Sequence, residues 1–470
     1  MPAPCGDKTP GFYRRRTPRE SPLFQLLEQH FDEFERVYPD RYQERYGFFR
    51  PVIRKAVDAF LGCGDLREGF ARVRCPDCGH NLFVAFSCKQ RGICPSCHQK
   101  RMLVTAINIA ENVAVAVRHR QFVFTMPKRF RAYFRYDRDL LKHLPRLAWE
   151  TVRDVYRAVL DRDDVVPGMV GAPQSFGDLI NWHPHMHTLS TDGAFAKDGT
   201  YLPVPDDLPI EPFLKLWEHK IFALLLAEGR ITEKVVEQMR SWRHSGFSVD
   251  KSVYLPAGDQ AAIQRLLQYM LRCPFSLKRM IQTTADGNVA YRATREKCIA
   301  FPTRNDTQFR RGVSRNFEIF EPLDFIAEVT QHIPEHGAQT VRYYGWYSNK
   351  ARGMRAKAAE QAKAKQSNGL EPLTTDESDT PYRKLCRMRW SALIKRVYEV
   401  DPLCCPQCGG AMTIVAFVEQ KDQADVIERI LKHCQLWNDY PPRAPPKPAA
   451  ASEFELEVEY VDFDEFLMGF

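Results

Sequence analysis

Six of the fourteen cysteines in this 470-residue chain form three pairs with two residues between the partners. The pairs are Cys75 with Cys78, Cys94 with Cys97, and Cys405 with Cys408. This spacing lets two thiolates reach one metal ion, and four thiolates complete the closed tetrahedral shell of structural zinc. Disulfides are the alternative, but they are typical of short exported proteins, and this long chain begins without an apolar signal segment. The cysteines therefore predict zinc-bound knuckles as fixed points of the fold.

The first two pairs lie close together in sequence and predict a single zinc site. Its four ligands would be Cys75, Cys78, Cys94 and Cys97. Cys88 or His80, which lie between the outer cysteines, could replace one of them. Basic residues flank the pairs and predict contacts to the phosphate backbone of DNA, with ordinary surface charge as the alternative. These residues are Lys89, Arg91, Lys100 and Arg101.

The third pair lies in the sequence Cys405-Pro-Gln-Cys408-Gly-Gly, which resembles one half of a zinc ribbon. No second CxxC pair follows it. A second zinc site at Cys405 and Cys408 would therefore need other ligands, and Cys404, His433 and Cys434 are the candidates. A degenerate knuckle that binds no metal is the alternative.

Length and charge restrict the class of protein. At about 150 residues per domain, the length predicts about three domains. No apolar run approaches the roughly 18–20 residues of a membrane span, which predicts a soluble protein without a membrane partner. The formal net charge of +8 permits an anionic partner such as nucleic acid. Residues 453–465 are acidic and contain no basic residue, so the rest of the chain is more basic than the total suggests.

Hydrophobic periodicity predicts a mixture of helices and strands, an α+β protein. We expect helices over residues 21–38, 102–117, 209–242, 260–271 and 321–334, and strands over residues 121–127, 186–191 and 246–256. After Gly353 the composition becomes basic and low in complexity, which indicates a linker or a solvated helix. These changes predict five regions: a helical and zinc-binding domain (1–117), a catalytic domain (118–353), a linker (354–380), a small CPxCGG module (381–440) and a proline-rich tether with the acidic tail (441–470).

Three histidines alternate in the sequence His183-Pro-His185-Met-His187. In a strand they would point to one face of the sheet, which is the arrangement that a metal site needs. A buried structural histidine is the alternative, and it suits a single histidine better than three in five residues.

Three tyrosines, Tyr343, Tyr344 and Tyr347, follow in a basic segment that includes Arg342, Lys350 and Arg352. Tyrosines that stack on the bases of a nucleic acid would give the same sequence pattern. The three cations predict further contacts to DNA.

The order of these motifs resembles the two-tyrosine HUH-type transposases of bacterial insertion sequences, the rolling-circle class. The resemblance rests on the strand FVFT, the two histidines around Met186, the Tyr-x-x-x-Tyr spacing, the segment SCKQRGICPSCHQKR and the terminal CPxCGG. It implies an HUH endonuclease-like central antiparallel sheet flanked by helices, with the zinc-knuckle domain before it and a small module after it.

The resemblance also implies roles for individual residues. His185 and His187 would bind the catalytic cation, Mg²⁺ or Mn²⁺, and His183 would be a third ligand or a neighbour. Gln331 and Asp178 are further candidates for the third ligand. Tyr343 and Tyr347 would be the nucleophiles, with Tyr344 as an alternative because it precedes a glycine, as in single-tyrosine relatives.

The predicted function is single-strand DNA cleavage and rejoining through a 5′-phosphotyrosine, in transposition of the protein's own element. The enzyme would be a metal-dependent HUH endonuclease and strand transferase, located in the bacterial cytoplasm at the nucleoid. Its partner would be single-stranded DNA, for which Phe122, Phe124, Trp182 and Trp346 are candidate contacts. For the phenylalanines, packing in the core is the favoured alternative. No nucleotide cofactor is expected, because no phosphate-binding glycine loop is present. A plasmid-type replication initiator or relaxase and a non-catalytic zinc-ribbon DNA-binding protein are the alternatives.

Overall fold

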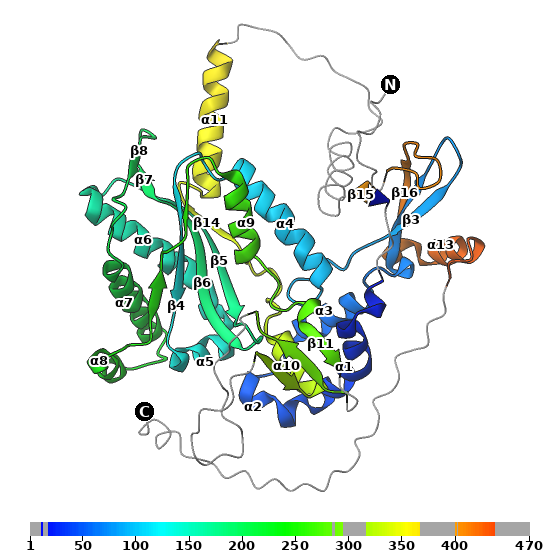
Figure 1. Ribbon diagram of the computed structural model, residues 1–470, viewed down its shortest axis with the longest axis horizontal. Coiled ribbons are helices and arrows are strands. Elements are labelled where there is room, and N and C mark those ends of the chain that lie inside the picture. The colour runs from blue at the N-terminus through cyan, green and yellow to red at the C-terminus, as the bar shows by residue number, and fades with distance from the viewer. Residues whose placement is uncertain are drawn as a thin grey trace.

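The computed structural model describes residues 11–12, 17–283, 287–294, 316–366, 400–401 and 403–437. These residues form a central sheet with helices on both faces, a helical part at one end of it, and a small β-ribbon head (Figure 1). Helices and antiparallel sheets occur without regular alternation, so the predicted α+β class is confirmed. Among the described helices, none has both the length and the apolar character that a membrane span requires.

The central sheet is antiparallel and follows the order β10-β4-β6-β5-β14, with β9 also pairing with β4. Its strands are β4 (His119–Thr125), β5 (Gly168–Phe176), β6 (Trp182–Thr191), β9 (Ser248–Asp250), β10 (Tyr254–Leu255) and β14 (Arg342–Gly345). The strands expected over residues 121–127 and 186–191 are therefore confirmed. The strands expected in 246–256 also exist, but each pairs with β4 rather than with the other.

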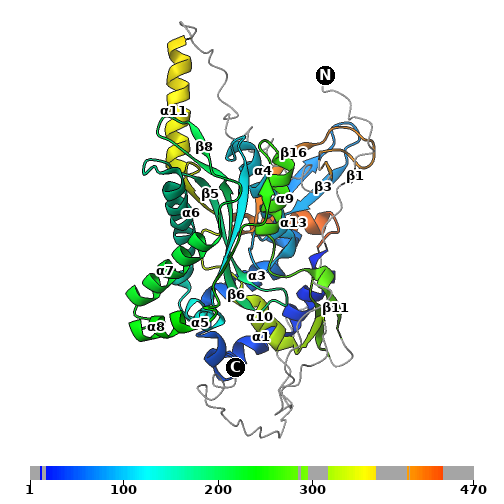
Figure 2. The same cartoon turned by 60° about the vertical axis from the view of Figure 1, so that its left-hand side comes forward.

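Helices cover both faces of this sheet (Figures 1 and 2). One face packs against α5 (Lys128–Tyr136), α6 (Leu144–Leu160), α7 (Glu211–Ala227) and α8 (Glu233–Ser241). The other packs against α4 (Pro95–Asn112) and α9 (Gln260–Met270). Phe122 and Phe124 are fully buried in the first of these cores. They therefore belong to the core, as the favoured alternative predicted, and not to a path for DNA.

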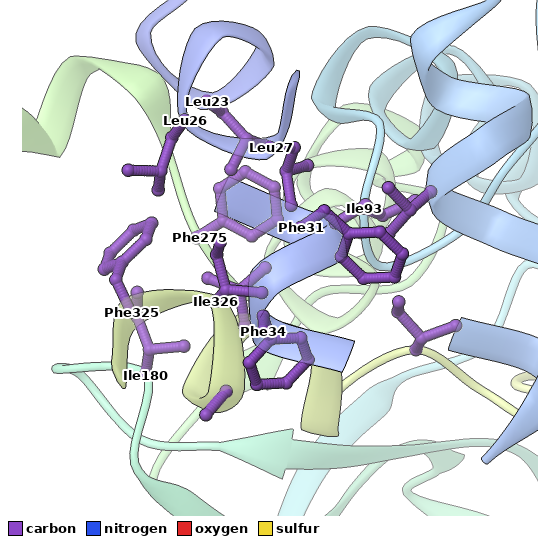
Figure 3. Close-up of a cluster of buried hydrophobic side chains, with 14 of the residues drawn as sticks. Leu23, Leu26, Leu27, Phe31, Phe34, Ile93, Ile180, Phe275, Phe325 and Ile326 are labelled. Atoms are coloured by element: carbon purple, nitrogen blue, oxygen red, sulfur yellow. The ribbon is translucent and has the colours of Figure 1, made fainter. Parts of the chain in front are cut away.

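The N-terminal helices α1 (Pro22–Arg41), α2 (Gln43–Tyr46) and α3 (Pro51–Leu61) form a second body. The helix expected over residues 21–38 is confirmed, and Ser21 caps it, since its side chain accepts a hydrogen bond from the Phe24 backbone at 3.3 Å. These helices pack on α10 (Pro322–Gln331) and the sheet of β11 (Met280–Thr283), β12 (Val289–Arg292) and β13 (Phe317–Phe320). Figure 3 shows their shared core, which contains Phe31 and Phe34 of α1 together with Phe325 and Ile326 of α10. The first helices thus fold against residues nearly 300 positions later.

The head is a three-stranded sheet with the order β16-β2-β3. Its strands are β2 (Gly69–Arg74), β3 (Asn81–Ala85) and β16 (Thr413–Glu419), and α13 (Gln420–His433) packs beside them. The middle strand belongs to the N-terminal region and pairs with β16 from the other end of the chain. The described part of the predicted C-terminal module, residues 403–437, therefore shares its core with residues 66–85.

The remaining elements are short, apart from one helix. The short strands are β1 (Gly11–Phe12), β7 (Gly193–Phe195), β8 (Tyr201–Pro203) and β15 (Val400–Asp401). The basic segment after Gly353 continues helix α11 (Asn349–Gln366), which projects away from the sheet in Figure 1. The rest of the predicted linker and the acidic tail lie outside the described residues.

Candidate functional site

The alternating histidines lie on β6, where strand geometry points their side chains to the same face. The Nε2 atoms of His185 and His187 are 3.0 Å apart. The second nitrogen of each ring is held in place as well. His185 Nδ1 lies 2.7 Å from the His183 carbonyl oxygen, to which it donates, and His187 Nδ1 lies 2.9 Å from the Gln121 side-chain amide on β4. The two rings are therefore fixed with their Nε2 atoms converging.

Burial keeps these imidazoles neutral. It lowers the pKa of His185 to about 4 and the pKa of His187 to about 3. Arg272, at the end of α9, adds to both shifts because its positive charge disfavours an imidazolium. At neutral pH each ring is uncharged and has one unprotonated nitrogen, which is the form that binds a metal ion.

A glutamine that the sequence did not single out faces the histidine pair. Gln174 on β5 lies directly opposite His185 in the sheet register and is 4% exposed. Its amide nitrogen donates to the Met270 carbonyl at 2.7 Å, whereas its Oε1 is buried without a hydrogen-bond partner. A buried carbonyl oxygen without a partner is costly unless a ligand satisfies it. No local sequence pattern around Gln174 could have identified it.

The third ligands suggested by the sequence lie elsewhere. Gln331 accepts a hydrogen bond from Arg138 at 2.7 Å, and Asp178 binds Arg279 and the Thr294 backbone. Those two expectations are wrong because both side chains serve the junction between the sheet and the helical body. Within the described ranges, no third histidine, cysteine or acidic residue completes a three-ligand group with His185 and His187. The His183 ring does lie 4.9 Å from the His185 ring, and its Nε2 is buried without a partner.

Tyr343 shares the histidine face of the sheet. It pairs with Val170 on β5, which pairs with Leu189 on β6, two residues beyond His187. Two strand spacings and two residues separate the Tyr343 and His187 backbones, which is roughly 12 Å. The Arg352 guanidinium lies 5.3 Å from the centre of the Tyr343 ring. Burial raises the pKa of Tyr343, and Arg352 opposes that rise.

Tyr344 points to the opposite face, since neighbouring residues of a strand alternate. Its ring stacks on Trp149 of α6 with the ring centres 5.7 Å apart. The sheet therefore separates Tyr344 from the histidines.

Tyr347 returns to the histidine face after a turn at Gly345, whose φ of 56° is left-handed and favours glycine. The ring covers Gly168, where an added Cβ would lie 3.0 Å from it. Tyr347 is fully buried, and its hydroxyl donates to His119 Nε2 at 2.6 Å and accepts from the Val115 backbone at 3.3 Å. Burial raises the pKa of Tyr347 above its usual value. The two tyrosines of the Tyr-x-x-x-Tyr motif thus lie on the same face of the sheet, but Tyr343 is half-buried whereas Tyr347 is fully buried.

Aromatic and basic groups surround this face. Tyr269 of α9 is 47% exposed and packs edge-on against His187, with Arg272 4.6 Å from the centre of the tyrosine ring. An open hollow of about 550 Å³ lies between the end of α4 and the start of α11. Its lining includes Val115, Asn349 and Arg352. The hollow therefore lies beside Tyr347, because the Val115 backbone contacts the Tyr347 hydroxyl.

The predicted DNA contacts have varied surroundings. Lys89, Arg101 and Lys350 are exposed, and Lys100, Arg342 and Arg352 are half-buried. Arg91 instead donates to the Ala338 carbonyl at 2.7 Å and to the Thr340 hydroxyl, so it joins two segments of the chain. Trp182 is buried, and Trp346 stacks on Phe195 at 4.2 Å beneath Arg355.

The cysteines form two groups that differ from the predicted one. In each group the four Sγ atoms lie within 4.8 Å of one another. The first group is Cys63, Cys88, Cys94 and Cys97, and the second is Cys75, Cys78, Cys405 and Cys408. The predicted single site is wrong because Cys75 and Cys78 lie at the tip of the β2–β3 hairpin, whereas Cys94 and Cys97 begin α4. The five residues of β3, about 17 Å of extended chain, run between those two places.

The first group is built into the N-terminal core. Cys63 follows α3, Cys88 lies in the loop after β3, and Cys94 and Cys97 lie at the start of α4. The Sγ separations include 3.8 Å between Cys63 and Cys97 and 3.6 Å between Cys88 and Cys97. Hydrogen bonding from the other thiols holds the pKa of Cys97 well below its usual range. Cys88 was an expected substitute ligand, whereas no CxxC spacing pointed to Cys63.

Two family models match this chain. Residues 168–355 match a family described as "Putative transposase" (Y2_Tnp), and this range includes the histidines and the tyrosines. Residues 30–126 match the IS91-type "Transposase zinc-binding domain", a range that includes the whole first cysteine group.

Two curated proteins resemble most of the chain. The transposase for insertion sequence element IS801 of Pseudomonas savastanoi pv. phaseolicola is 23% identical over 389 residues, which cover 79% of this chain and 85% of the relative. "Putative transposase y4qJ" of Sinorhizobium fredii (strain NBRC 101917 / NGR234) is 22% identical over 402 residues, which cover 81% of this chain and 94% of the relative. No solved structure matches the chain.

Proposed function

This chain belongs to the insertion-sequence transposases that carry an IS91-type zinc-binding domain, and we propose that it cuts and rejoins single-stranded DNA with a β14 tyrosine as nucleophile. The observation that carries the proposal is the shared face of the central sheet, on which Tyr343 and the two converging histidines lie. The reaction would serve rolling-circle transposition of the element that encodes the protein.

The histidine pair fits a divalent cation, Mg²⁺ or Mn²⁺. Two nitrogens 3.0 Å apart match neighbouring ligands of an octahedral ion with bonds of about 2.1 Å. The unpartnered Oε1 of Gln174 would supply a third ligand from the next strand. Bound there, the cation would polarise the scissile phosphate and offset the negative charge that develops on it.

Gln121 would act as a positioning residue for this site. For His187 Nε2 to bind a cation, the ring proton must lie on Nδ1 and needs an acceptor. The Gln121 amide lies 2.9 Å from Nδ1 and would present its oxygen after half a turn about its last bond. His185 needs no such change, because its Nδ1 already faces the His183 carbonyl oxygen.

Tyr343 would make the first cut. Its Oη would attack the phosphorus, the bond to the 3′ oxygen would break, and that oxygen would take up a proton to give a 3′-hydroxyl and a 5′-phosphotyrosine. A tyrosine hydroxyl has a usual pKa near 10, so it reacts well only if its anion is stabilised. Arg352, beside the Tyr343 ring, provides a positive charge for that purpose. The energy of the broken bond stays in the phosphotyrosine, so rejoining needs no nucleotide.

Tyr347 would be the nucleophile of the second step, after its side chain leaves the buried position that it occupies. Its hydroxyl is bound to His119 and Val115, and its ring is buried, so it cannot attack DNA from this position. The hollow beside it, lined by Arg352 and Arg355, is a suitable path for the DNA backbone. Near the histidines, Tyr269 offers an exposed ring on which a base could stack.

The test is covalent adduct formation on a library of labelled single-stranded oligonucleotides with Mg²⁺ or Mn²⁺, read on denaturing gels and mapped by mass spectrometry. We expect Tyr343→Phe to abolish the first adduct, and Tyr344→Phe to change its yield by less than about threefold. Tyr347→Phe should preserve the first adduct and block strand transfer. An adduct that maps to Tyr344, or DNA binding without any adduct, would contradict the proposal. The cut sequences would also separate a transposase from a plasmid replication initiator, which shares the chemistry.

A further inference from the structure

We infer that Cys75, Cys78, Cys405 and Cys408 bind one zinc ion, in a second site that the two ends of the chain build together. This inference goes beyond the proposed function and does not depend on it. The matched zinc-binding domain ends at residue 126, so it does not include Cys405 or Cys408.

The two halves of the site have the same backbone geometry. In one turn, the Cys75 N–H donates to the His80 carbonyl at 2.9 Å, and the Gly79 N–H donates to the Cys75 carbonyl at 3.0 Å. The corresponding bonds of the other turn, Cys405 to Gly410 and Gly409 to Cys405, are both 2.9 Å. Gly79 and Gly409 have φ values of 76° and 73°, in the left-handed region. Both are CPxCG knuckles that present two thiols in the same direction.

The distances between the knuckles fit a zinc ion. Cys75 Sγ lies 3.5 Å from Cys408 Sγ, and Cys78 Sγ lies 3.5 Å from Cys405 Sγ. A tetrahedral ion with Zn–S bonds of about 2.3 Å separates its sulfurs by about 3.8 Å. A disulfide would bring two sulfurs to about 2.05 Å. The sulfurs are thus arranged around a common centre rather than as two bonded pairs.

The surrounding fold brings the knuckles together. Strand β16 pairs with β2 from Thr413 opposite Arg74 to Glu419 opposite Gly69, directly beside the cysteines. Cys75 and Cys405 are buried in a small core that includes Val73 and Met412, whereas Cys78 and Cys408 are exposed. One ion would therefore fasten the C-terminal segment to the N-terminal hairpin at the tip of the head (Figure 1).

The test is the zinc content of the full-length protein, measured by native mass spectrometry and elemental analysis. We expect two zinc ions per chain in the wild type and one in the Cys405→Ser/Cys408→Ser variant. The matched control is Cys404→Ser/Cys434→Ser, which changes two nearby cysteines outside the group and should keep two ions. One ion in the wild type, two in the Cys405→Ser/Cys408→Ser variant, or iron in place of zinc would overturn the inference.

A further variant separates a metal ligand from a thiol needed only for folding. Cys408→His should retain two zinc ions, because three cysteines and one histidine also form a common structural zinc site. Cys408→Ala should instead lose one ion, and two ions in that variant would exclude Cys408 as a ligand. The wild-type count remains decisive even if a substituted chain fails to fold. None of these results requires DNA cleavage, so failure of the proposed function would be seen separately.

Discussion

The histidine site and the cysteine groups are both candidate metal sites, but they are assembled differently. On the central sheet, His185 and His187 come from one strand, and Gln174 lies on the next strand. In the head, Cys75 and Cys78 meet Cys405 and Cys408, which lie more than 320 residues later. The sheet would be intact without its cation, since β6 is paired with β4 and β5 over its length. The second cysteine group instead joins segments from opposite ends of the chain, which otherwise meet through the β2–β16 pairing and the small cores of the head.

Because of this difference, loss of a ligand should affect the two kinds of site in different ways. Loss of a histidine should reduce DNA cleavage without unfolding the protein. Loss of a cysteine should instead lower the stability of the fold around it.

The largest effect is expected for Cys63→Ser. Cys63 is 5% exposed in the N-terminal core and belongs to the first cysteine group. Loss of a structural metal site is one of the few single changes that cost more than about 4 kcal/mol. We expect the zinc content to fall by one ion and the N-terminal body to unfold at lower denaturant, as followed by hydrogen exchange. Cys273→Ser is the matched control, since Cys273 packs on the same core outside the group. Equal effects of the two changes would contradict a structural ion.

His187→Ala should strongly reduce DNA cleavage while the protein stays folded. Removing one group that stabilises charge in a transition state costs on the order of 100- to 1,000-fold in rate. We therefore expect adduct formation to fall by that factor, with the zinc content and the unfolding midpoint of the head unchanged. His183→Ala is the control, because His183 lies beside the pair and should reduce the rate by less than about tenfold. If His183→Ala is as damaging as His187→Ala, His183 rather than Gln174 is the third ligand.

The sequence could predict that the three histidines share one face of the sheet, because side chains in a strand alternate with a period of two. Alternating histidines in an apolar segment therefore share a face wherever the strand lies. The helix that begins near Ser21 and the strand β4 depend on equally local patterns, and both are confirmed. Gln174 could not be found in this way, because its place opposite His185 depends on the register between two strands.

The cysteine groups could not be predicted from proximity along the chain. Cys94 and Cys97 lie at the start of a helix, whereas the other two pairs end in glycine after CPxC. That shared glycine was the signal that Cys75 and Cys78 belong with Cys405 and Cys408. Likewise, no local pattern indicates that α1 packs on α10, since both expose ordinary apolar faces.

Gln174→Leu should have a smaller effect than a histidine change. Leucine keeps most of the side-chain volume but removes Oε1, the proposed third ligand. Even the loss of a residue that only supports the metal ligands typically costs 10- to 100-fold in metal affinity or activity. We expect the Mn²⁺ concentration for half-maximal adduct formation to rise by that factor, while the maximal rate recovers at high Mn²⁺. Gln331→Leu, which changes a glutamine bound to Arg138, should leave the Mn²⁺ dependence unaltered. An unchanged Mn²⁺ dependence in Gln174→Leu would exclude Gln174 as a ligand.

Acidification should have the smallest effect of the four, and it concerns histidines away from the proposed cation. Burial lowers the pKa of His332 to about 3 and the pKa of His119 to about 4. The unfolded chain, with a histidine pKa near 6.5, therefore binds more protons, and stability is lost as the pH falls from about 6.5 toward 3–4. Between pH 6.5 and 5.5 each imidazole should cost about 1 kcal/mol of unfolding free energy. Urea unfolding at both pH values, without added Mg²⁺ or Mn²⁺, would measure it. His332→Gln should remove the His332 share of this loss, and an unaltered pH dependence in that variant would show that His332 is not buried as a neutral imidazole.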